Sequence, residues 1–232
     1  MVLSSLQRSG KAAAMYRFTL ASADLIALAS GALFWPAEKL LVVSDLHFGK
    51  SERLARRGGA LLPPFETRDT LQRLDDDLES TGARRVICLG DSFDDLHSAD
   101  AMDAGDQLWL TRLIAGRDWV WIEGNHDAGP FALGGSHLAD MQLGPLAFRH
   151  IASGDTPEIS GHYHPKLRLA GRARRCFLLD ATRVIMPAYG SYTGGLWTYD
   201  AALTKLMQPQ ALAVAIGKTA LALPMPRTMP QL

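Results

Sequence analysis

Short apolar runs in the first half of this chain each end in polar residues. The run 40–43 is continuously apolar and is followed at once by Ser44 and Asp45. The runs 84–89 and 118–122 repeat this arrangement and also lead into polar segments that contain glycine. Continuous apolar runs of this length are typical of strands buried on both faces. The pattern therefore predicts three buried strands, each followed by a polar loop.

Between these strands the spacing of apolar residues changes to that of helices. Three leucines fall on one face of the segment 66–80, and Gly82 supplies a stop signal after it. A second helix is expected at 101–115, which is also followed by a glycine. The alternation of strands and helices predicts parallel strand pairs joined by crossover helices.

The second half of the chain has short apolar runs separated by turn residues. Strands are expected here at 146–151, 158–160, 176–179, 184–186 and 196–199. A first strand is expected at 15–20, and a final hairpin at 211–223 turns around Gly217. Because no helical pattern separates the short runs, this half is predicted to form mixed or antiparallel pairs.

Composition limits the class of protein. The chain has 232 residues, and its 24 basic and 24 acidic side chains give a formal net charge of zero. A chain of this length forms one domain with its own core. Zero net charge is weak evidence against a protein that coats nucleic acid non-specifically. It does not exclude a local basic surface that binds nucleic acid. The two cysteines are not in CxxC spacing, which predicts free thiols in a reducing compartment.

The ends of the chain differ from its middle. No segment is apolar and long enough to span a bilayer, and the polar residues 1–14 lack the apolar core of a signal peptide. We therefore predict a cytoplasmic protein with a disordered extension at 1–14 and a single domain at 15–223. The stretch 224–232 contains three prolines and is predicted to be a frayed tail.

Five segments carry side chains that bind metal ions. They are Asp45 with His47, Asp91, the run Asn125 to Asp127, His150, and His162 with His164. Side chains two apart in an extended segment point the same way, so Asp45 and His47 are expected to reach one ion together. His162 and His164 are expected to do the same. Sites in open α/β sheets form beyond the carboxyl ends of the strands, so one pocket can collect these residues.

The ligand types indicate which metals fit. Imidazole nitrogen argues against magnesium or calcium and for manganese, iron or zinc. The absence of thiolate ligands argues against a closed structural zinc site. We therefore predict two divalent transition metal ions in an open catalytic pair, with manganese preferred and iron or zinc as alternatives.

Each of these motifs alone also has an ordinary explanation. A single DxH or GD is common by chance, GHxH is weak evidence, and GNHD after an apolar strand is only moderately specific. All of them in this order, each at the end of a predicted strand, favour a real site. The remaining histidines, His97 and His137, fall in polar segments and are interpreted as ordinary surface residues.

The set resembles the calcineurin-like metallophosphoesterase superfamily, whose pattern is DxH, GDxxD, GNH with an acid, a separate His, and GHxH. The resemblance covers residues 45–164 and implies an α/β fold, a four-layer α-β-β-α sandwich of two mixed sheets flanked by helices. It implies one metal held by Asp45, His47, Asp91 and His164. Asp91 would bridge to a second metal held by Asn125, His150 and His162. The assignment of His150 as a ligand depends on a motif of one residue, and His137 is the alternative.

The same resemblance implies a mechanism and roles for residues that are not ligands. A hydroxide bridging the two metals attacks phosphorus in line with the leaving group. His126 would donate a proton to the leaving oxygen or stabilise the transition state. Asp94 would orient His126. Asp127 would instead support the metal ligands from behind, without binding a metal itself. For Asp95 a solvated loop acid is an equally good interpretation.

Further segments narrow the resemblance. They are 45–52, 62–67, 89–95, 148–150, 159–166 and 190–196. The chain from about residue 15 to residue 199 is similar to the bacterial ligase-associated DNA damage response endonuclease family (PdeM). That resemblance implies a DNA phosphodiester substrate, endonuclease activity in DNA repair, and a functional link to DNA ligase and helicase.

Basic residues give the sequence's own support for DNA. One group, Lys50, Arg53, Arg56 and Arg57, follows the first motif, and a second group, Arg172, Arg174 and Arg175, follows the last. Contacts from such residues to phosphates give salt-dependent binding. Lys50 and Arg53 are the preferred substrate-binding residues because they lie nearest the motif. Solvated basic faces explain the groups equally well, and Tyr163 and Tyr192 suit either base stacking or packing.

Two other functions remain open. One is a phosphodiesterase for a small nucleotide or metabolite, which the zero net charge supports. The other is a non-catalytic scaffold of the same fold. A scaffold is free to lose ligands, whereas this chain has the complete set together with His126, which weighs strongly against it.

Overall fold

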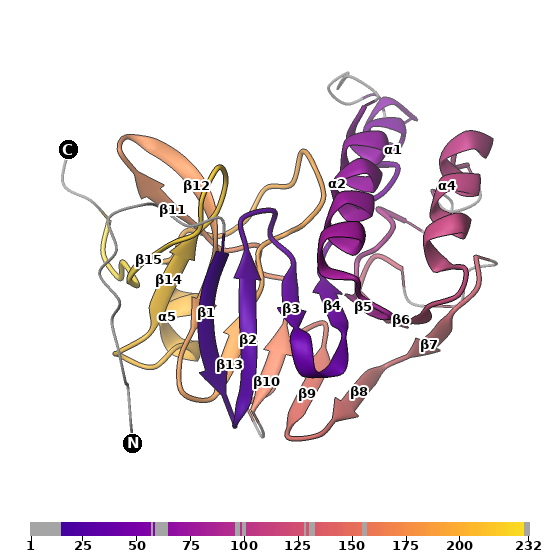
Figure 1. The fold of residues 1–232 in the computed structure, drawn as a ribbon. Helices are drawn as coiled ribbons and strands as arrows, with labels where there is room; N and C mark the ends of the chain where they lie inside the picture. Colours follow the sequence, from indigo (N-terminus) through magenta and orange to yellow (C-terminus); the bar gives the residue numbers. More distant parts are fainter. Residues whose placement is uncertain are drawn as a thin grey trace.

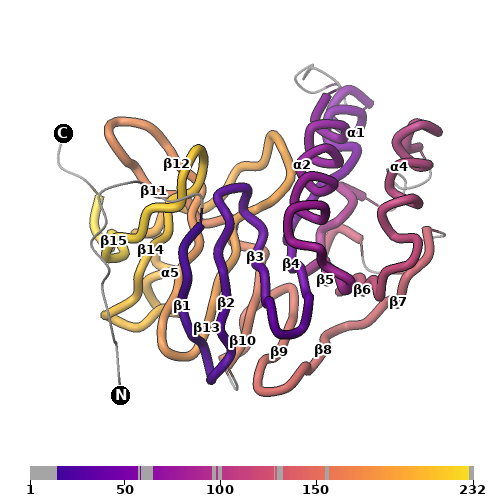
Figure 2. The backbone as a smooth tube through the Cα atoms, viewed as in Figure 1, coloured from indigo at the N-terminus to yellow at the C-terminus, as the bar shows by residue number. Residues whose placement is uncertain are grey.

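Two β-sheets pack face to face, and helices cover their outer faces (Figure 1). The structure, a computed structural model, describes residues 15–56, 58, 65–95, 98, 101–127, 129, 133–154 and 157–229. The predicted extension at 1–14, the segment 62–64, Arg57 and His97 lie outside the described residues. The α/β class and the two mixed sheets are confirmed, and Figure 2 traces the chain from the first sheet (indigo to magenta) into the second (orange to yellow).

The first sheet contains strands in the order of the sequence. In the described residues they are β1 (Met15–Leu20), β2 (Ala23–Leu28), β3 (Leu33–Trp35), β4 (Leu40–Val43), β5 (Arg85–Leu89), β6 (Asp118–Ile122) and β7 (Ser136–Leu138). Strands β1 to β4 pair antiparallel, and β4 to β7 pair parallel. The three predicted buried strands are β4, β5 and β6, so their carboxyl ends share one edge.

Helices connect the parallel strands of the first sheet, as predicted. They are α1 (Lys50–Arg56), α2 (Glu66–Thr81) and α4 (Ala104–Ile114), with a short 3-10 turn η1 (Pro36–Glu38) before β4. Helix α2 buries Leu71, Leu74 and Leu78, the leucines with helical spacing. It ends at Gly82, which has φ 63° and donates its N–H to Leu78 O. Glycine adopts this left-handed conformation without a steric cost, so the stop signal had a physical basis.

The second sheet is mixed. Its strands are β8 (Asp140–Leu143), β9 (Leu146–Arg149), β10 (Glu158–Ser160), β12 (Arg172–Leu179), β13 (Arg183–Ile185), β14 (Leu212–Ala215) and β15 (Leu221–Pro224), and β11 (Lys166–Leu169) pairs with β12. Strands β9, β10 and β13 are parallel, whereas β14 and β15 form the predicted final hairpin. The strand expected at 196–199 is wrong, because Trp197 makes only an isolated bridge with Lys166. Helix α5 (Ala201–Leu206) follows it.

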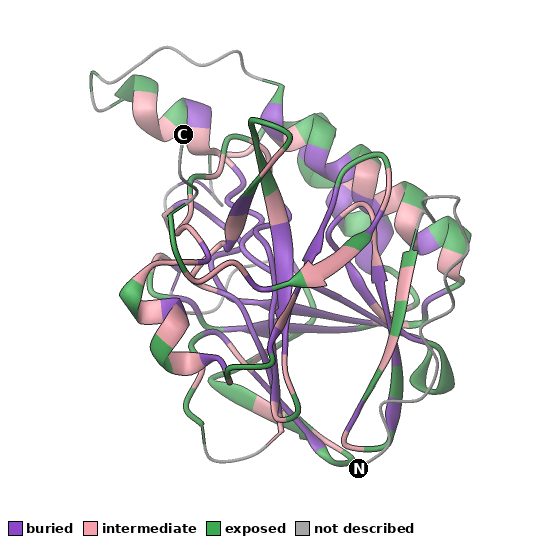
Figure 3. Cartoon of the chain, turned by 90° about the vertical axis from the view of Figure 1, so that its left-hand side faces the viewer, coloured by how far each residue is buried: buried purple, intermediate pink, exposed green. Residues whose placement is uncertain are grey.

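Three apolar clusters separate the four layers. One lies between the sheets and contains Leu40 and Val42, while a second lies under α2 and α4 and contains Leu41 and Val43. A third packs the second sheet against Leu203 of α5. Alternate residues of β4 therefore face different clusters, which explains its continuously apolar sequence. Figure 3 shows buried residues (purple) in the strands and exposed ones (green) on the outer helices.

The stretch that begins at Pro224 is attached to the domain as far as it is described. Pro224 ends β15, and Met225 is buried with its N–H donated to Ala211 O. Arg227 donates to Met207 O. Only residues 230–232 of the predicted tail lie outside the description. Among the described helices none is long and apolar enough to cross a membrane.

Candidate metal centre and active site

The polar residues after the parallel strands lie in turns with a left-handed backbone. Asp45, His47 and Asp91 have φ values of 53°, 47° and 48°. His162 and His164, after β10, have φ values of 70° and 46°. The expectation that paired ligands share a direction because their segments are extended is therefore wrong. Non-glycine residues seldom adopt this conformation, and they do so most often where a site requires it.

Glycines let these turns approach one another. A Cβ atom on Gly190 would lie 1.9 Å from Leu46 O, between the first two metal-binding side chains. A Cβ on Gly124 would lie 2.1 Å from the backbone nitrogen of Asp91, and one on Gly161 would lie 1.8 Å from Ser44 Oγ. Real Cβ atoms do not come this close, so only glycine fits. Close packing of the turns therefore requires glycine at Gly124 of the GN motif and at Gly161 of the GH motif.

The first ligand cluster combines Asp45, His47 and His164. One donor atom from each lies within 4.8 Å of the others, and His164 Nε2 is 2.9 Å from Asp45 Oδ1. The Nε2 atom of His47 is buried and has no hydrogen-bond partner among the described residues. Buried imidazole nitrogens without a partner are costly unless a ligand takes the lone pair. The cluster therefore fits a metal ion.

The ends of strands β5, β6, β9 and β10 bring the second cluster together. Asp91, His150 and His162 place donor atoms within 4.8 Å of one another. His150 Nε2 lies 3.0 Å from Asn125 Oδ1 and 3.1 Å from His162 Nδ1. All four predicted donors of the second site are thus adjacent. The rival His137 lies in β7 and stacks on Trp121 instead.

Hydrogen bonds prepare two of the histidines as ligands. His150 Nδ1 lies 2.8 Å from Leu89 O, which can only accept, so this nitrogen carries the proton. His47 Nδ1 lies 2.9 Å from Asp94 Oδ1 and is oriented in the same way. In both rings Nε2 then faces the cluster, and it can give its lone pair to a metal once Nδ1 carries the only proton. Metal-binding histidines are commonly fixed through their second nitrogen in this manner.

Charges in the clusters favour ionised carboxylates. Burial acts to raise the pKa of Asp91, but the hydrogen bond and charge of His150 lower it below its usual value. Asp45 has a lowered pKa for a similar reason, since His164 outweighs the effect of burial. Burial acts to lower the pKa of His150, but Asp91 raises it to about 9. In the metal-free protein a proton on His150 thus takes the place of positive charge from a metal.

Asp94 does not orient His126 through its carboxylate. That carboxylate contacts His47 Nδ1 at 2.9 Å and Arg53 Nε at 2.8 Å. His126 Nδ1 instead lies 3.0 Å from the backbone oxygen of Asp94. Its side chain therefore contacts the candidate ligand His47, and only its backbone contacts His126.

Asp127 supports the backbone of the Asp91 turn. Its carboxylate is buried and accepts N–H groups from Asp91, Ser92, Phe93 and Gly124 at distances of 2.7 to 3.1 Å. Burial raises the pKa of Asp127, and the nearby Asp91 charge adds to that effect. The expected position behind the ligands matches this geometry.

Comparison with known proteins identifies the family. A model of the calcineurin-like phosphoesterase family matches residues 38–192, well over half of the chain. The chain belongs to the calcineurin-like phosphoesterases. It is therefore a metal-dependent phosphoesterase, as the sequence motifs predict. A comparison with curated protein sequences gives no significant match.

The chain is also similar to several solved structures. The nuclease MPE of Pseudomonas putida is 29% identical, with a TM-score of 0.70 and coverage of 89% of this chain and 100% of that one. The phosphoesterase Yfce from E. coli is 12% identical, with a TM-score of 0.38 and coverage of 81% and 99%. A phosphoesterase proposed from sequence in Streptococcus pneumoniae is 13% identical, with a TM-score of 0.32 and coverage of 80% and 96%.

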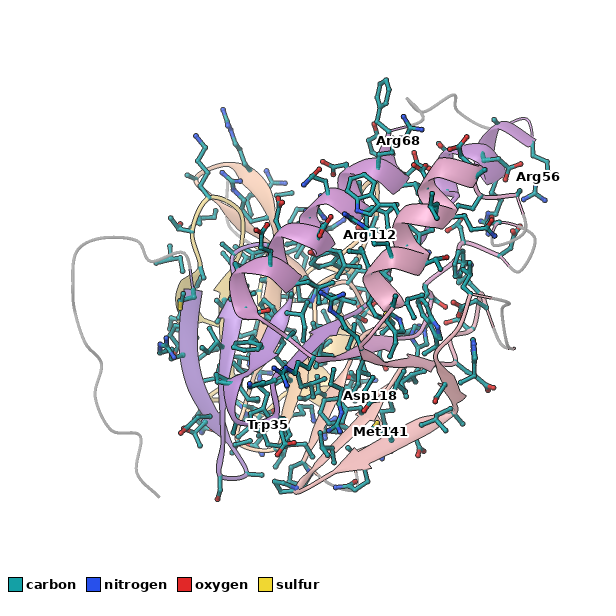
Figure 4. All side chains as sticks on the ribbon, turned by 45° about the vertical axis from the view of Figure 1, so that its right-hand side comes forward. Trp35, Arg56, Arg68, Arg112, Asp118 and Met141 are labelled. Atoms are coloured by element: carbon teal, nitrogen blue, oxygen red, sulfur yellow. The ribbon has the colours of Figure 1, made fainter. Side chains whose placement is uncertain are left out.

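The basic residues of α1 in this phosphoesterase are largely paired with acids. Arg53 contacts Asp94, and Lys50 Nζ lies 3.9 Å from the same carboxylate. Arg56, labelled in Figure 4, pairs with Glu52 and Asp95. The predicted substrate contacts Lys50 and Arg53 are thus next to the site, but their charge is partly neutralised.

Asp95 forms an ordered turn of its own. Its carboxylate accepts the backbone N–H and the hydroxyl of Ser98. Burial acts to raise the pKa of Asp95, but Ser98 and Arg56 lower it to about 2. This is a structural role, in agreement with the interpretation as a loop acid. The exposed Tyr192 lies in the loop that begins at Gly190, whereas Tyr163 packs edge-on against His162 at 5.0 Å.

A hollow of about 430 Å³ opens beside the second cluster. It is lined by Glu123, Asn125, Asp140, Arg149 and His150, among others. Arg149 is turned toward Ser153 and Glu158, so its charge is already engaged. The hollow therefore has the carboxylates of Glu123 and Asp140 in its lining, next to Asn125 and His150 of the second cluster.

Proposed function

We propose that this chain is a dimetal phosphodiesterase that cleaves DNA, acting as an endonuclease in DNA repair. The observation that carries the proposal is the pair of adjacent ligand clusters, Asp45 with His47 and His164, and Asp91 with His150 and His162. Such paired sites suit in-line displacement at phosphorus. The likeness to the nuclease MPE supports a nucleic-acid substrate.

In this proposal the two clusters hold two divalent ions, preferably manganese, with iron or zinc as alternatives. One ion would take Asp45, His47, Asp91 and His164, and the other would take Asp91, Asn125, His150 and His162. When bound, such ions lower the pKa of a water and offset the charge that develops on the phosphoryl oxygens. The donor set of carboxylate, amide and imidazole groups without thiolates supports these metals.

His126 is the proposed proton donor. Its Nδ1–H is held by the backbone oxygen of Asp94, which leaves Nε2 to face the reacting group. The ring lies edge-on to His47 with centroids 5.4 Å apart, so it is next to the first cluster. A proton on Nε2 passes to the leaving oxygen as its bond to phosphorus breaks, and neutral imidazole remains.

The finer parts of the proposal rest on the resemblance to the ligase-associated endonucleases. These are DNA as the physiological substrate, cleavage within a strand, a cytoplasmic location, and a functional link to DNA ligase and helicase. Lys50 and Arg53 are the proposed contacts for the phosphate next to the scissile bond. Their position on α1 beside Asp94 supports this assignment.

The test is a substrate series with the metal-free protein before and after addition of manganese. The series contains a phosphomonoester, a small phosphodiester, cyclic nucleotides, and linear and circular single- and double-stranded DNA. Cleavage of circular DNA is the expected result, because it requires attack within a strand. Failure to hydrolyse any diester would overturn the phosphodiesterase assignment, and hydrolysis of small diesters alone would overturn the nuclease assignment.

A diesterase for a small nucleotide is the second candidate. The hollow of about 430 Å³ beside Asn125 and His150 favours it, because this volume suits a small ligand. The same substrate series decides between the two. A much higher kcat/KM for a cyclic or dinucleotide substrate than for DNA would favour the small substrate.

A further inference from the structure

The β11–β12 hairpin carries positive charge without acidic partners. Residues 166–175 include five basic side chains and no acidic one. Arg168, Arg172 and Arg174 are exposed, and none has a carboxylate at ion-pair distance among the described residues. By contrast, Arg53 and Arg56 of α1 are paired with acids. In a chain of zero net charge, the hairpin is therefore a local positive surface.

The base of the hairpin is fixed in place. Leu167 and Leu169 pack into the apolar cluster under α5, and Lys166 and Arg168 lie over the ring of Trp197 at 4.8 and 5.5 Å. These cation–π contacts hold the ammonium of Lys166 and the guanidinium of Arg168 beside the ring, where both still carry their positive charge. The charges are thus presented on an ordered support.

Arg175 does not belong to this surface, although the sequence groups it with Arg172 and Arg174. Its guanidinium is turned inward and donates to the backbone oxygens of Ala188, Tyr189 and Gly190. Burial and the nearby Arg73 lower the pKa of Arg175 to about 10. Arg175 thus stabilises the loop at Gly190, which packs on Leu46. Its charge is not available to a substrate, unlike the exposed charges of Arg172 and Arg174.

The hairpin starts directly at the metal centre. Lys166 follows the candidate ligand His164 by two residues, and its N–H is donated to Leu196 O. The adjacent Gly195 packs so closely on His164 that a Cβ would lie 1.9 Å from His164 O. In Figure 1 the hairpin extends toward the top of the view, as α1 does. Any substrate at the centre therefore has the hairpin as a neighbour.

The hairpin is long enough to contact several successive phosphates of a nucleic-acid strand. The four residues of β11 span about 13 Å at a rise of about 3.3 Å per residue. Phosphates of a nucleic-acid strand are spaced by about 3.4 Å along the helix axis, so the tip lies about four phosphates from the base. The hollow beside the second cluster has Glu123 and Asp140 in its lining, and their negative charges repel a polyanion. The charges thus favour one direction for the strand.

We propose that the β11–β12 hairpin is a binding arm for the nucleic-acid strand beyond the scissile phosphate, with Arg168 along β11 and Arg172 at the tip as phosphate contacts. The proposal rests on the proposed nuclease function and adds the path of the substrate. The arm supplies affinity for a chain of phosphates and takes no part in bond cleavage.

The experiment compares two double variants of the manganese-loaded protein. The tip variant, Arg168→Gln/Arg172→Gln, removes two charges from the hairpin and keeps a polar side chain beside Trp197 at position 168. The control Lys39→Gln/Arg84→Gln removes two exposed charges at the amino ends of β4 and β5, opposite the metal centre. Each variant is assayed with a dinucleotide and with a single-stranded DNA of about 20 nucleotides, over a range of salt concentrations.

For the tip variant we expect a raised KM for the long DNA, unchanged kcat, and unchanged kinetics with the dinucleotide. The slope of log kcat/KM against log salt should become shallower by about 1.4, since each lost phosphate contact contributes about 0.7. The control variant should match the wild type. If wild type cleaves DNA and both variants behave alike, the arm is overturned while the nuclease function stands. If wild type cleaves only the dinucleotide, the nuclease function fails, and the arm fails with it.

Discussion

The Nδ1 atom of His47 lies 2.9 Å from Oδ1 of Asp94, which makes this carboxylate the partner of a candidate metal ligand. Arg53 contacts the other oxygen of the same carboxylate at 2.8 Å. Although burial opposes it, the hydrogen bond from His47 lowers the pKa of Asp94. One carboxylate thus links the first metal cluster to the basic residues of α1.

This relationship predicts the effect of Asp94→Asn on metal binding. The amide keeps the size of the side chain but removes the charge that orients His47, so metal affinity should fall about 10- to 100-fold. Metal content after dialysis against graded manganese concentrations measures the loss. Asp95→Asn is the matched control, because Asp95 pairs with Arg56 and Ser98. Equal metal affinity in the two variants would contradict the role given to Asp94.

His126→Ala should separate chemistry from metal binding. His126 lies beside the clusters and contributes no donor atom to either of them, so the variant should keep both metals and lose about 10²- to 10⁴-fold in kcat on DNA. A diester with a nitrophenolate leaving group needs little protonation, so its loss should be smaller. His137→Ala controls for removal of a histidine elsewhere. Equal losses on both substrates would show that His126 does not protonate the leaving oxygen.

Much of the fold could be predicted because the apolar pattern is regular where packing is two-sided. Each apolar residue of β4 and each leucine on the buried face of α2 packs into one of the apolar clusters. The sequence pattern is therefore sufficient to predict the strand and the helix. Segment 196–199 also has the apolar and aromatic residues that are typical of a strand. In the structure Trp197 stacks on Tyr199, and the segment does not join a sheet as a strand. Tertiary contacts of this kind override a local pattern that is only four residues long.

The site could be predicted as a set of residues but not as a geometry. The motifs identified the donors, because carboxylate and imidazole groups at strand ends are rare in combination. The sequence could not show that Asp45 and His47 have left-handed backbones, since that conformation depends on contacts with Gly190 and with the β5 turn. Nor could it show that the side chain of Asp94 turns to His47, because residues 47 positions apart in sequence decide this.

Gly190→Ala should damage the centre without touching a ligand. Its Cβ would lie 1.9 Å from Leu46 O, so the backbone between Asp45 and His47 must move. We expect a loss of about 1–3 kcal/mol in the free energy of unfolding, as for other overpacked sites, together with weaker metal binding. Gly194→Ala is the control in the same loop, because its Cβ would meet nothing within 4 Å. Similar thermal unfolding and metal content in both variants would contradict the close packing.

The metal-free protein should lose stability as the pH rises above neutrality. The pKa of His150 is raised from 6.5 to about 9 by Asp91, against the effect of burial, so the folded state holds a proton that the unfolded state releases. This contribution is complete below about pH 6.5 and is lost as the pH rises through about 9. Urea unfolding of the metal-free protein at pH 7 and pH 10 measures the loss. His150→Gln should lack this part of the dependence, and metal-loaded protein should lack it as well, because a bound metal excludes the proton. An equal loss in wild type and His150→Gln would show that the proton on His150 does not stabilise the fold.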